Sequence, residues 1–272
     1  MITQAIALLL PGTGLVIGLM FVLWLIHLRM GNASIVDPGW AYGLAIMALT
    51  FALLGPGYFW RRWLMAGMAL AWGLRLGTYL LLRILGKEEE GRYQELRRRW
   101  KTNLKWKFLL FFQFQAVLVI FLSLPFLLAA LNTAPAISAL EMIGAALWLA
   151  ARAGESTADR QLAAFKRESG TSKQVCQRGL WAYSRHPNYF FEWLVWVAWA
   201  IFAAASPWGW VALLCPLLML YLLFRVTGIP ATEQQALSTK GDAYRLYQQA
   251  TSAFVPWFHK PAPIADNRIA AR

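Results

Sequence analysis

The sequence predicts an all-α integral membrane protein with about seven transmembrane helices, and three observations lead to this fold class. Of the 272 residues, 59% are hydrophobic and only 14% are charged, which is too apolar for an ordinary soluble domain. Apolar runs of about 20 residues, the length of a helix that crosses a bilayer, recur along most of the chain. Lys and Arg gather in particular connections between the runs, as in membrane proteins of fixed orientation. The seven predicted segments are residues 6–28, 35–54, 64–85, 108–131, 140–165, 189–205 and 208–227.

The first four segments form the N-terminal half. The first is expected to remain as a helix, because it has no basic stretch before it and its nearest charge, Arg29, follows it, unlike in a removable signal peptide. The second begins with Asp37-Pro38-Gly39, so a broken start, a tilt or a late beginning is expected there. The third and fourth are long apolar runs that a strongly basic connection separates.

The last three segments carry more polar residues. The fifth holds Arg152, Glu155 and Asp159, whose spacing places them on one stripe of a helix. The sixth is short and follows Pro187, a residue that favours the first turn of a helix. Ser206-Pro207 predicts a tight turn into the seventh. Residues 1–260 are therefore expected to form one membrane domain, and residues 261–272, rich in Ala, Pro and Arg, a disordered tail.

The positive charges predict the orientation. The connection after the third segment, the one after the fifth and the C-terminal tail are all basic, so they should face the cytoplasm and the N-terminus should be periplasmic. Arg61 and Arg62 are the main exceptions on the outer side. The net charge of +13 is accounted for by this topology and by anionic headgroups, and no nucleic-acid partner is expected. The basic residues of the connection after the third segment are Arg83, Lys87, Arg92, Arg97, Arg98, Arg99, Lys101, Lys105 and Lys107.

Neither cysteines nor histidines predict a metal site. Cys176 and Cys215 lack a C-x-x-C spacing, and His27, His186 and His259 are scattered along the chain. We expect no metal ion and no disulfide framework.

Ionisable residues inside the predicted segments point to function. Each costs on the order of 2.5–3.5 kcal/mol at mid-membrane, so each should pair or line a wet cavity. A stripe on the sixth segment is expected to face the stripe on the fifth, with basic loop residues at the mouth of the resulting pocket. Such a pocket suits a phosphorylated cofactor that enters from the cytoplasm. The stripe of the sixth segment is Tyr189, Glu192, Trp193 and Trp196, and the basic residues are Lys166, Arg178 and Arg185.

Plainer interpretations stay open for several of these residues. Arg152 and Glu155 also fit a structural pair that joins two helices, and Asp159 fits a solvated acid near a helix end. His186 or Asn188 also fits a helix cap. The run 97–99 of three arginines also fits a solvated surface next to lipid.

Two motifs resemble the bacterial membrane branch of the steroid 5α-reductase family, and the resemblance extends over essentially the whole chain. They are Glu155-x-x-x-Asp159-x-Gln161-Leu162-x-x-Phe165-Lys166 and Gly179-Leu180-Trp181-x-Tyr183-Ser184-Arg185-His186-Pro187-Asn188-Tyr189-Phe190-x-Glu192. The ending Ser252-Ala253-Phe254-Val255-Pro256-Trp257, the run Asp37-Pro38-Gly39-Trp40, Arg75-Leu76-Gly77 with Arg83, and Arg92-Tyr93 are also similar to that branch.

This resemblance implies an enzyme of the bacterial inner membrane that uses NADPH to reduce a carbon–carbon double bond conjugated to a ketone, as in 3-oxo-Δ4-steroids. It implies an NADPH site at Asp159, Lys166, Asn188 and Glu192, with Arg83, Arg178, Arg185, His186 and Tyr189 as neighbours and Glu233 and Tyr247 closing over the cofactor. The cofactor side is expected in the last three segments, and the substrate side in the first four.

The catalytic pair is expected to be an acid and a tyrosine, because negative charge develops on the ketone oxygen and a donor must stabilise it. The family's animal members use a Glu on the second helix and a Tyr on the third. This chain has Asp37 in place of the Glu, and it would have to be protonated to donate. Tyr79 is the first candidate for the tyrosine and Tyr42 the second.

A rival function shares part of the motif. Isoprenylcysteine and phospholipid methyltransferases also carry an Arg-His-Pro-x-Tyr element, where it binds S-adenosylmethionine. The run from Glu155 to Lys166, together with Asp37, favours the reductase. A non-enzymatic lipid-binding or transport protein is the third alternative, and it predicts no nucleotide binding. The expected partners are a hydrophobic steroid or isoprenoid enone and membrane lipid, and the protein is expected to be a monomer.

Overall fold

A computed structural model of the protein describes residues 2–170, 174–226 and 228–258. These residues are mostly helical and contain no strand, so the predicted all-α class is confirmed for them. The predicted tail, residues 261–272, and His259 lie outside the described residues. The chain forms two compact units, Met1–Ala145 with Trp199–Cys215, and Ala146–Ala198 with Pro216–Arg272.

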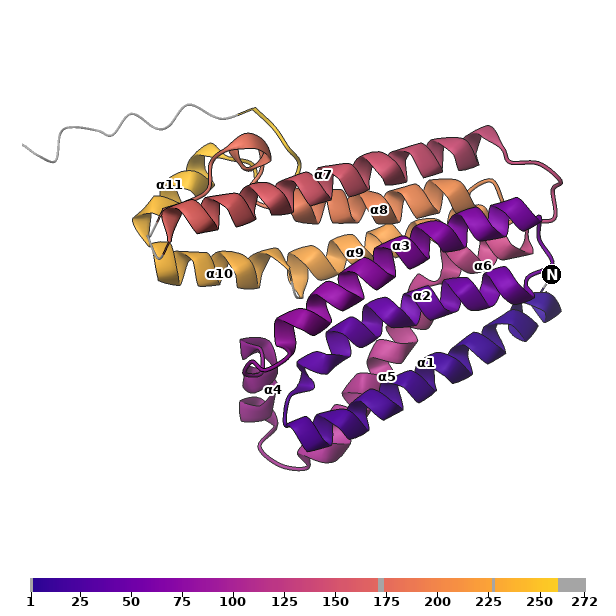
Figure 1. Ribbon diagram of the computed structural model, residues 1–272, viewed down its shortest axis with the longest axis horizontal. Coiled ribbons are helices and arrows are strands. Elements are labelled where there is room, and N and C mark those ends of the chain that lie inside the picture. Colours follow the sequence, from indigo (N-terminus) through magenta and orange to yellow (C-terminus); the bar gives the residue numbers. More distant parts are fainter. Residues whose placement is uncertain (1, 171–173, 227, 259–272) are drawn as a thin grey trace, which may run out of the picture. The chain divides into compact units, whose positions relative to one another are not determined.

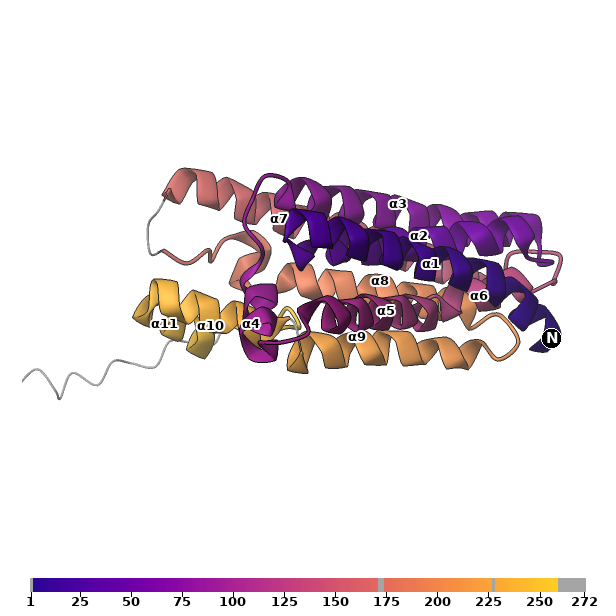
Figure 2. The same cartoon turned by 90° about the horizontal axis from the view of Figure 1, so that it is seen from below.

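Unit 1 is built around the helix α2. The unit contains α1 (Ile2–Met30), α2 (Val36–Leu54), α3 (Phe59–Ile84), α4 (Gly91–Trp100), α5 (Leu104–Leu122) and α6 (Leu124–Leu131). In Figures 1 and 2, α1, α2 and α3 lie side by side, and α5 and α6 cover another side of α2. Most of the α2 side chains are buried as a result.

Small residues let the α2 and α3 backbones approach closely. A Cβ on Gly73 would lie 2.8 Å from the carbonyl oxygen of Ala41, and one on Gly77 would lie 2.5 Å from the ring of Tyr42. Without a hydrophobic driving force between helices in lipid, such close packing is what holds transmembrane helices together. Unit 1 also contains an aromatic core, in which Trp72 and Trp199 are fully buried and their ring centroids are 5.3 Å apart.

Two predicted segments differ in detail. The second is not broken at Pro38, because a short 3₁₀ turn (Ala33–Ile35) leads into α2 and Pro38 falls in its first turn, where a missing N–H is harmless. The fourth was predicted as one helix but is divided into α5 and α6 at Ser123. Pro125 in the first turn of α6 has no N–H to donate to the preceding turn, and the Ser123 hydroxyl donates to the carbonyl of Ile120 (2.7 Å).

Arg61, one of the two exceptions to the charge asymmetry, is neutralised inside the fold. Its side chain is 1% exposed and forms an ion pair with Glu141, which is 0% exposed. One guanidinium nitrogen, Nη1, also donates to the carbonyl oxygens of Asn132 (2.8 Å) and Ala134 (2.7 Å). These hydrogen bonds fasten the loop after α6 to the start of α3, and the ion pair attaches Glu141 to the same place.

Replacing Glu141 by Gln is expected to destabilise the protein by about 3–5 kcal/mol, because the Arg61 charge would stay buried without its partner. Thermal unfolding in detergent measures the effect. A double substitution, Arg61→Met with Glu141→Leu, should recover much of the lost stability, and Glu95→Gln, at an exposed acid, should leave the midpoint unchanged. An unaltered midpoint for Glu141→Gln would contradict the importance of this pair.

Unit 2 contains the C-terminal part of α7 (Ala139–Ser169), most of α8 (Pro187–Ala203) and α9 (Leu214–Arg225), and the helices α10 (Ile229–Lys240) and α11 (Asp242–Ala250). Within it, α7 and α8 lie side by side in Figure 1. Gly154 permits this approach, because a Cβ there would meet the Phe191 ring at 2.4 Å.

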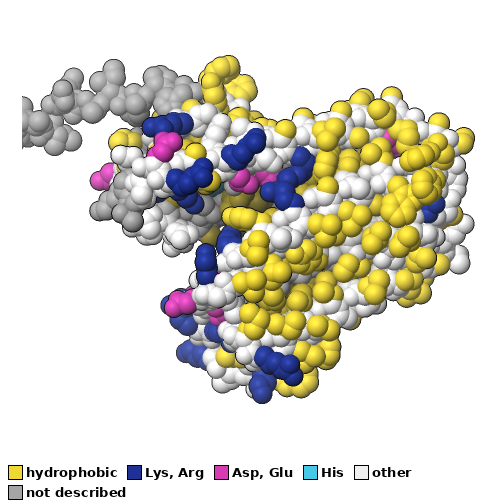
Figure 3. Space-filling model, viewed as in Figure 1, with side chains coloured by type: hydrophobic (Ala, Val, Ile, Leu, Met, Phe, Trp, Pro, Cys, Tyr) yellow, Lys and Arg dark blue, Asp and Glu magenta, His cyan; other side chains and the backbone are white. Residues whose placement is uncertain are grey.

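Among the described residues, five helical stretches are long and apolar enough to cross a membrane. They are Ile2–Met30, Ala33–Leu54, Phe59–Ile84, Leu104–Leu131 and Gly209–Lys240. Figure 3 shows hydrophobic side chains spread over the outward face of α1, α2 and α3, where a soluble protein would carry charges. The chain is therefore a multi-pass membrane protein.

Candidate functional site

Asp37 lies at the start of α2, where a polar turn fixes the backbone. The Asn32 side chain accepts from the Ser34 backbone N–H (2.9 Å) and thereby caps the turn. Two further hydrogen bonds attach the connection after α3 to this turn: Ala33 N–H donates to Glu89 Oε1 (2.7 Å), and Glu90 N–H donates to Ser34 Oγ (3.0 Å). The connection is thus held where it can bring α4 over the end of α2.

Tyr93 and Arg92 of α4 both bind Asp37. The Tyr93 hydroxyl donates to Asp37 Oδ1 (2.6 Å), and the Arg92 guanidinium donates to Oδ2. Arg92 also donates to Glu90 (3.1 Å), which in turn pairs with Arg83. The result is a connected group of polar side chains, the Asp37 cluster, which consists of Asp37, Arg83, Glu90, Arg92 and Tyr93.

The Tyr93 hydroxyl stays protonated in this setting. Its side chain is only 3% exposed, although Arg92 beside it is 44% exposed. Burial, followed by the charge of Asp37, raises the pKa of Tyr93 well above its usual value. A tyrosine with a raised pKa remains a hydrogen-bond donor at neutral and mildly alkaline pH, while both oxygens of Asp37 act as acceptors.

The tyrosine that contacts Asp37 is therefore Tyr93 rather than Tyr79. Tyr79 on α3 is 58% exposed, and the Tyr42 hydroxyl makes its hydrogen bond with Thr78 (3.1 Å). The resemblance includes Arg92-Tyr93 but predicts no role for Tyr93, which lies in a polar connection outside the apolar runs. Besides the resemblance, its signal is that it is the only tyrosine in the sequence of that connection. Arg83, which was expected beside the cofactor residues, belongs to the Asp37 cluster in unit 1.

Unit 2 brings the central predicted residues together. Asn188, in the first turn of α8, donates to Asp159 Oδ1 of α7 (3.3 Å). One turn further along α8, Glu192 accepts from the indole N–H of Trp196 (3.3 Å). Both acids are partly buried, so Asp159 is not a fully solvated acid, and Asn188 contacts α7.

Two residues of the predicted stripe on α8, Tyr189 and Trp193, bind elements other than α7. Asn188 and Phe191 contact α7, whereas Tyr189 donates to or accepts from Thr232 (3.1 Å) and Trp193 donates to the carbonyl of Pro216 (3.0 Å). Successive residues of a helix are about 100° apart, so adjacent residues such as Asn188 and Tyr189 face different neighbours.

Arg185 and His186 hold α10 in place. Arg185 Nε donates to Glu233 Oε1 (2.7 Å), and His186 Nε2 lies 3.2 Å from the same oxygen. Arg185 also donates to the carbonyl oxygens of Gln248 (3.0 Å) and Thr251 (2.6 Å). Both residues are expected from the sequence to line the cofactor site. In the structure they position α10 and the chain after α11.

The loop before α8 is fixed by side chains from α7 and α11. Gly179 has a φ of +58°, and a Cβ there would lie 2.4 Å from the Gln161 amide, whose oxygen accepts from Leu180 N–H (2.9 Å). The Tyr247 hydroxyl donates to the carbonyls of Trp181 and Ser184 (3.1 Å to the latter). Tyr247 therefore secures the loop.

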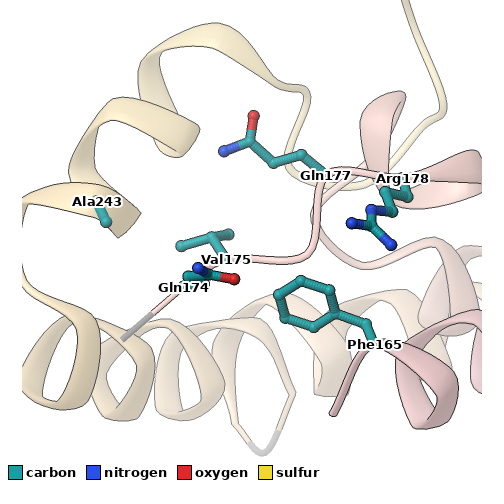
Figure 4. A pocket seen from close by; sticks show the side chains of 6 residues that line it. All are labelled: Phe165, Gln174, Val175, Gln177, Arg178 and Ala243. Carbon is teal, nitrogen blue, oxygen red and sulfur yellow. The ribbon is translucent and has the colours of Figure 1, made fainter. Parts of the chain in front are cut away.

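A pocket of about 390 Å³ lies beside this loop, between α7 and α11 (Figure 4). Arg178 on its rim is 74% exposed and pairs with Glu168 (2.8 Å), and Lys166 is also exposed. These two cations are free to move toward a phosphorylated ligand at low cost, because exposed ion pairs are weak. The pocket is lined by Phe165, Gln174, Val175, Gln177, Arg178 and Ala243.

Arg152 and Glu155 form a pair, as the plainer interpretation predicts, but within one helix and not between two. They form an ion pair one turn apart on α7, with side chains 12% and 7% exposed. The pair satisfies two charges in a largely apolar stretch, so no ligand is needed to explain them.

Comparison with known proteins adds a family. A family model described as "Protein of unknown function (DUF1295)" matches residues 23–251. The chain belongs to the DUF1295 family. The DUF1295 match includes the Asp37 cluster and all the predicted residues of unit 2. Neither the curated proteins nor the solved structures gave a match.

Proposed function

We propose that this protein is an NADPH-dependent reductase that saturates the carbon–carbon double bond of a hydrophobic enone, such as a 3-oxo-Δ4-steroid or an isoprenoid enone. One observation carries the proposal: the buried Tyr93 hydroxyl donates to Asp37 at 2.6 Å. A protonated tyrosine held by a carboxylate is a suitable donor for a ketone oxygen on which negative charge develops.

The residues of the Asp37 cluster would have different roles in the reduction. NADPH, when bound, supplies the hydride that adds to the β-carbon of the enone. Tyr93 would turn its proton from Asp37 to the ketone oxygen and stabilise the enolate. Asp37 would orient the hydroxyl, and Arg92 would balance the charge of Asp37. A proton must then reach the α-carbon, and the protonated Tyr93 is one source for it.

The residues of unit 2 fit a phosphorylated dinucleotide. The Asn188 amide and the carboxylates of Asp159 and Glu192 offer hydrogen bonds to ribose hydroxyls and the nicotinamide amide, and Lys166 and Arg178 offer exposed charge for phosphates. His186, Tyr189 and Glu233 would shape the site through α10, as would Arg185.

The same proposal includes the membrane topology. We place α7 and α8 across the bilayer in addition to the five long apolar stretches, giving seven spans with the N-terminus outside and the C-terminus in the cytoplasm of a bacterial inner membrane. Helix α8 has 17 residues, which is about the shortest length that spans a bilayer. The Arg61–Glu141 pair removes one of the two exceptions to the positive-inside pattern. Residues 1–260 would act as one domain in a monomer.

A ligand-binding panel tests the proposal. The purified protein is expected to be stabilised against thermal unfolding by NADPH and much less by NADH, because a ligand that binds only the folded state raises its stability. Nicotinamide fluorescence gives the affinity independently. Stabilisation by S-adenosylmethionine alone would move the function to methyl transfer, and no response to any of the three ligands would favour a non-enzymatic lipid-binding protein.

A further inference from the structure

The three consecutive arginines of α4 separate into an inward and an outward set. Arg97 points inward, where it binds Glu89 (2.7 Å) and lies 4.7 Å from the centroid of the Phe108 ring. Arg98 and Arg99 point outward, and the side chain of each is 72% exposed. Only the outward set is available to a partner.

Two lysines extend the outward set toward α5. Lys101 and Lys105 are exposed, and within the described residues neither side chain forms an ion pair. Arg98 and Arg99 share one acid, Glu95, which is itself exposed. Four cations and one carboxylate leave a net charge of about +3 on this surface, which we name the α4–α5 basic patch and which consists of Arg98, Arg99, Lys101 and Lys105.

The patch borders an apolar stripe that faces outward along α5. The side chains of Trp106, Leu110, Phe114 and Val117 are 68%, 70%, 56% and 59% exposed, and their spacing keeps them on one side of the helix. The stripe belongs to a stretch able to cross a membrane. Trp106 stands where the cations end and the apolar side chains begin, which is the position of tryptophan at a membrane interface.

The α1 helix fixes this border. The indole N–H of Trp24 donates to the backbone carbonyl of Lys105 (3.0 Å), so the first turn of α5 is held against α1. Figure 3 shows Lys and Arg side chains gathered at the edge of the broad hydrophobic face of unit 1. Cations at the end of a stretch able to cross a membrane, beside exposed apolar side chains, complement a lipid whose headgroup is anionic.

We propose that the α4–α5 basic patch binds the phosphate-bearing headgroups of anionic phospholipids and so enriches them around this edge of the protein. The attraction is electrostatic and should fall with ionic strength. The inference does not depend on the reductase function, because it uses none of the residues assigned to that reaction.

The test measures which lipid is next to Trp106. The full-length protein is reconstituted into bilayers of phosphatidylcholine and phosphatidylglycerol in which either lipid, at equal mole fraction, carries brominated acyl chains that quench tryptophan. Subtracting the signal of Trp106→Phe isolates Trp106. Brominated phosphatidylglycerol is expected to quench it about 3-fold more than brominated phosphatidylcholine, and 0.5 M NaCl should reduce the ratio toward one.

Substitution of the patch supplies the decisive comparison. Arg98→Gln with Lys101→Gln and Lys105→Gln should bring the ratio close to one. A matched control, Arg160→Gln with Arg167→Gln and Arg245→Gln, removes the same charge from exposed positions of unit 2 and should keep the ratio of the wild type. A wild-type ratio near one, or an equal loss in both triple variants, would overturn the proposal. If the triple variant does not fold, Lys101→Gln alone and the salt titration replace it as the test. Each should reduce the quenching ratio, and an unchanged ratio in both would overturn the proposal.

Discussion

Replacing Tyr93 by Phe is expected to lower the turnover of an enone by about 100- to 1,000-fold while the affinity for NADPH changes by less than about twofold. The substitution removes one hydroxyl, the donor that lies 2.6 Å from Asp37, and keeps the buried ring. Steady-state kinetics with a 3-oxo-Δ4-steroid give kcat, and nicotinamide fluorescence gives the affinity. Asp37→Asn should act in the same direction, because the amide neither balances Arg92 nor orients the hydroxyl as a carboxylate does.

Tyr79→Phe and Tyr42→Phe are the matched controls, because each removes a hydroxyl that does not contact Asp37. Both variants should keep turnover within about threefold of the wild type, as expected where no transition-state contact is lost. If Tyr79→Phe abolished turnover and Tyr93→Phe did not, the donor would be the tyrosine of α3, and the Asp37 cluster would have only a structural role.

Asn188→Ala and Glu192→Ala are each expected to weaken NADPH binding by about 10- to 100-fold in a protein that stays folded, which is the cost of losing hydrogen bonds to charged or polar groups in a partly buried site. Thermal unfolding without ligand establishes that the variants are folded, and titration with NADPH gives the dissociation constant.

Thr157→Ala is the control for this pair. Thr157 lies on α7 close to Asp159 in sequence, but its hydroxyl donates to the carbonyl of Ala153 (2.8 Å) and accepts from Arg160 (3.2 Å). This variant should bind NADPH as the wild type does. Wild-type affinity in both Asn188→Ala and Glu192→Ala would show that the α7–α8 residues of unit 2 are not the cofactor site.

The parts of the fold that follow from hydropathy could be predicted from the sequence. Apolar runs and Pro187 place the helices to within a few residues, because burial in lipid requires continuous helices. The division between α5 and α6 could not be predicted in this way, since Ser123 and Pro125 interrupt the hydrogen bonds without interrupting the apolar run. The start of α2 is continuous although Asp37-Pro38-Gly39 suggests a break, because a proline in the first turn of a helix breaks no hydrogen bond.

The candidate site was predictable where its residues are close along helices and not where they are distant. Asp159 and Asn188 meet as two facing helices imply, although Tyr189 and Trp193 of the predicted stripe bind elements other than α7. Tyr93 is 56 residues from Asp37, and their contact depends on how a polar connection folds over the end of α2. No periodicity in the sequence encodes that path. The contacts of Arg185 and His186 with α10 could not be predicted from the sequence for the same reason.

The most direct measurement follows deuterium from [4-²H]NADPH into the product of a 3-oxo-Δ4-steroid incubated with the full-length protein in lipid bilayers. We expect deuterium at C5, the β-carbon of the enone, with one NADPH consumed for each double bond reduced, and a solvent proton at C4. Intact enones, both the steroid and a polyprenyl enone, together with unconsumed NADPH would contradict it.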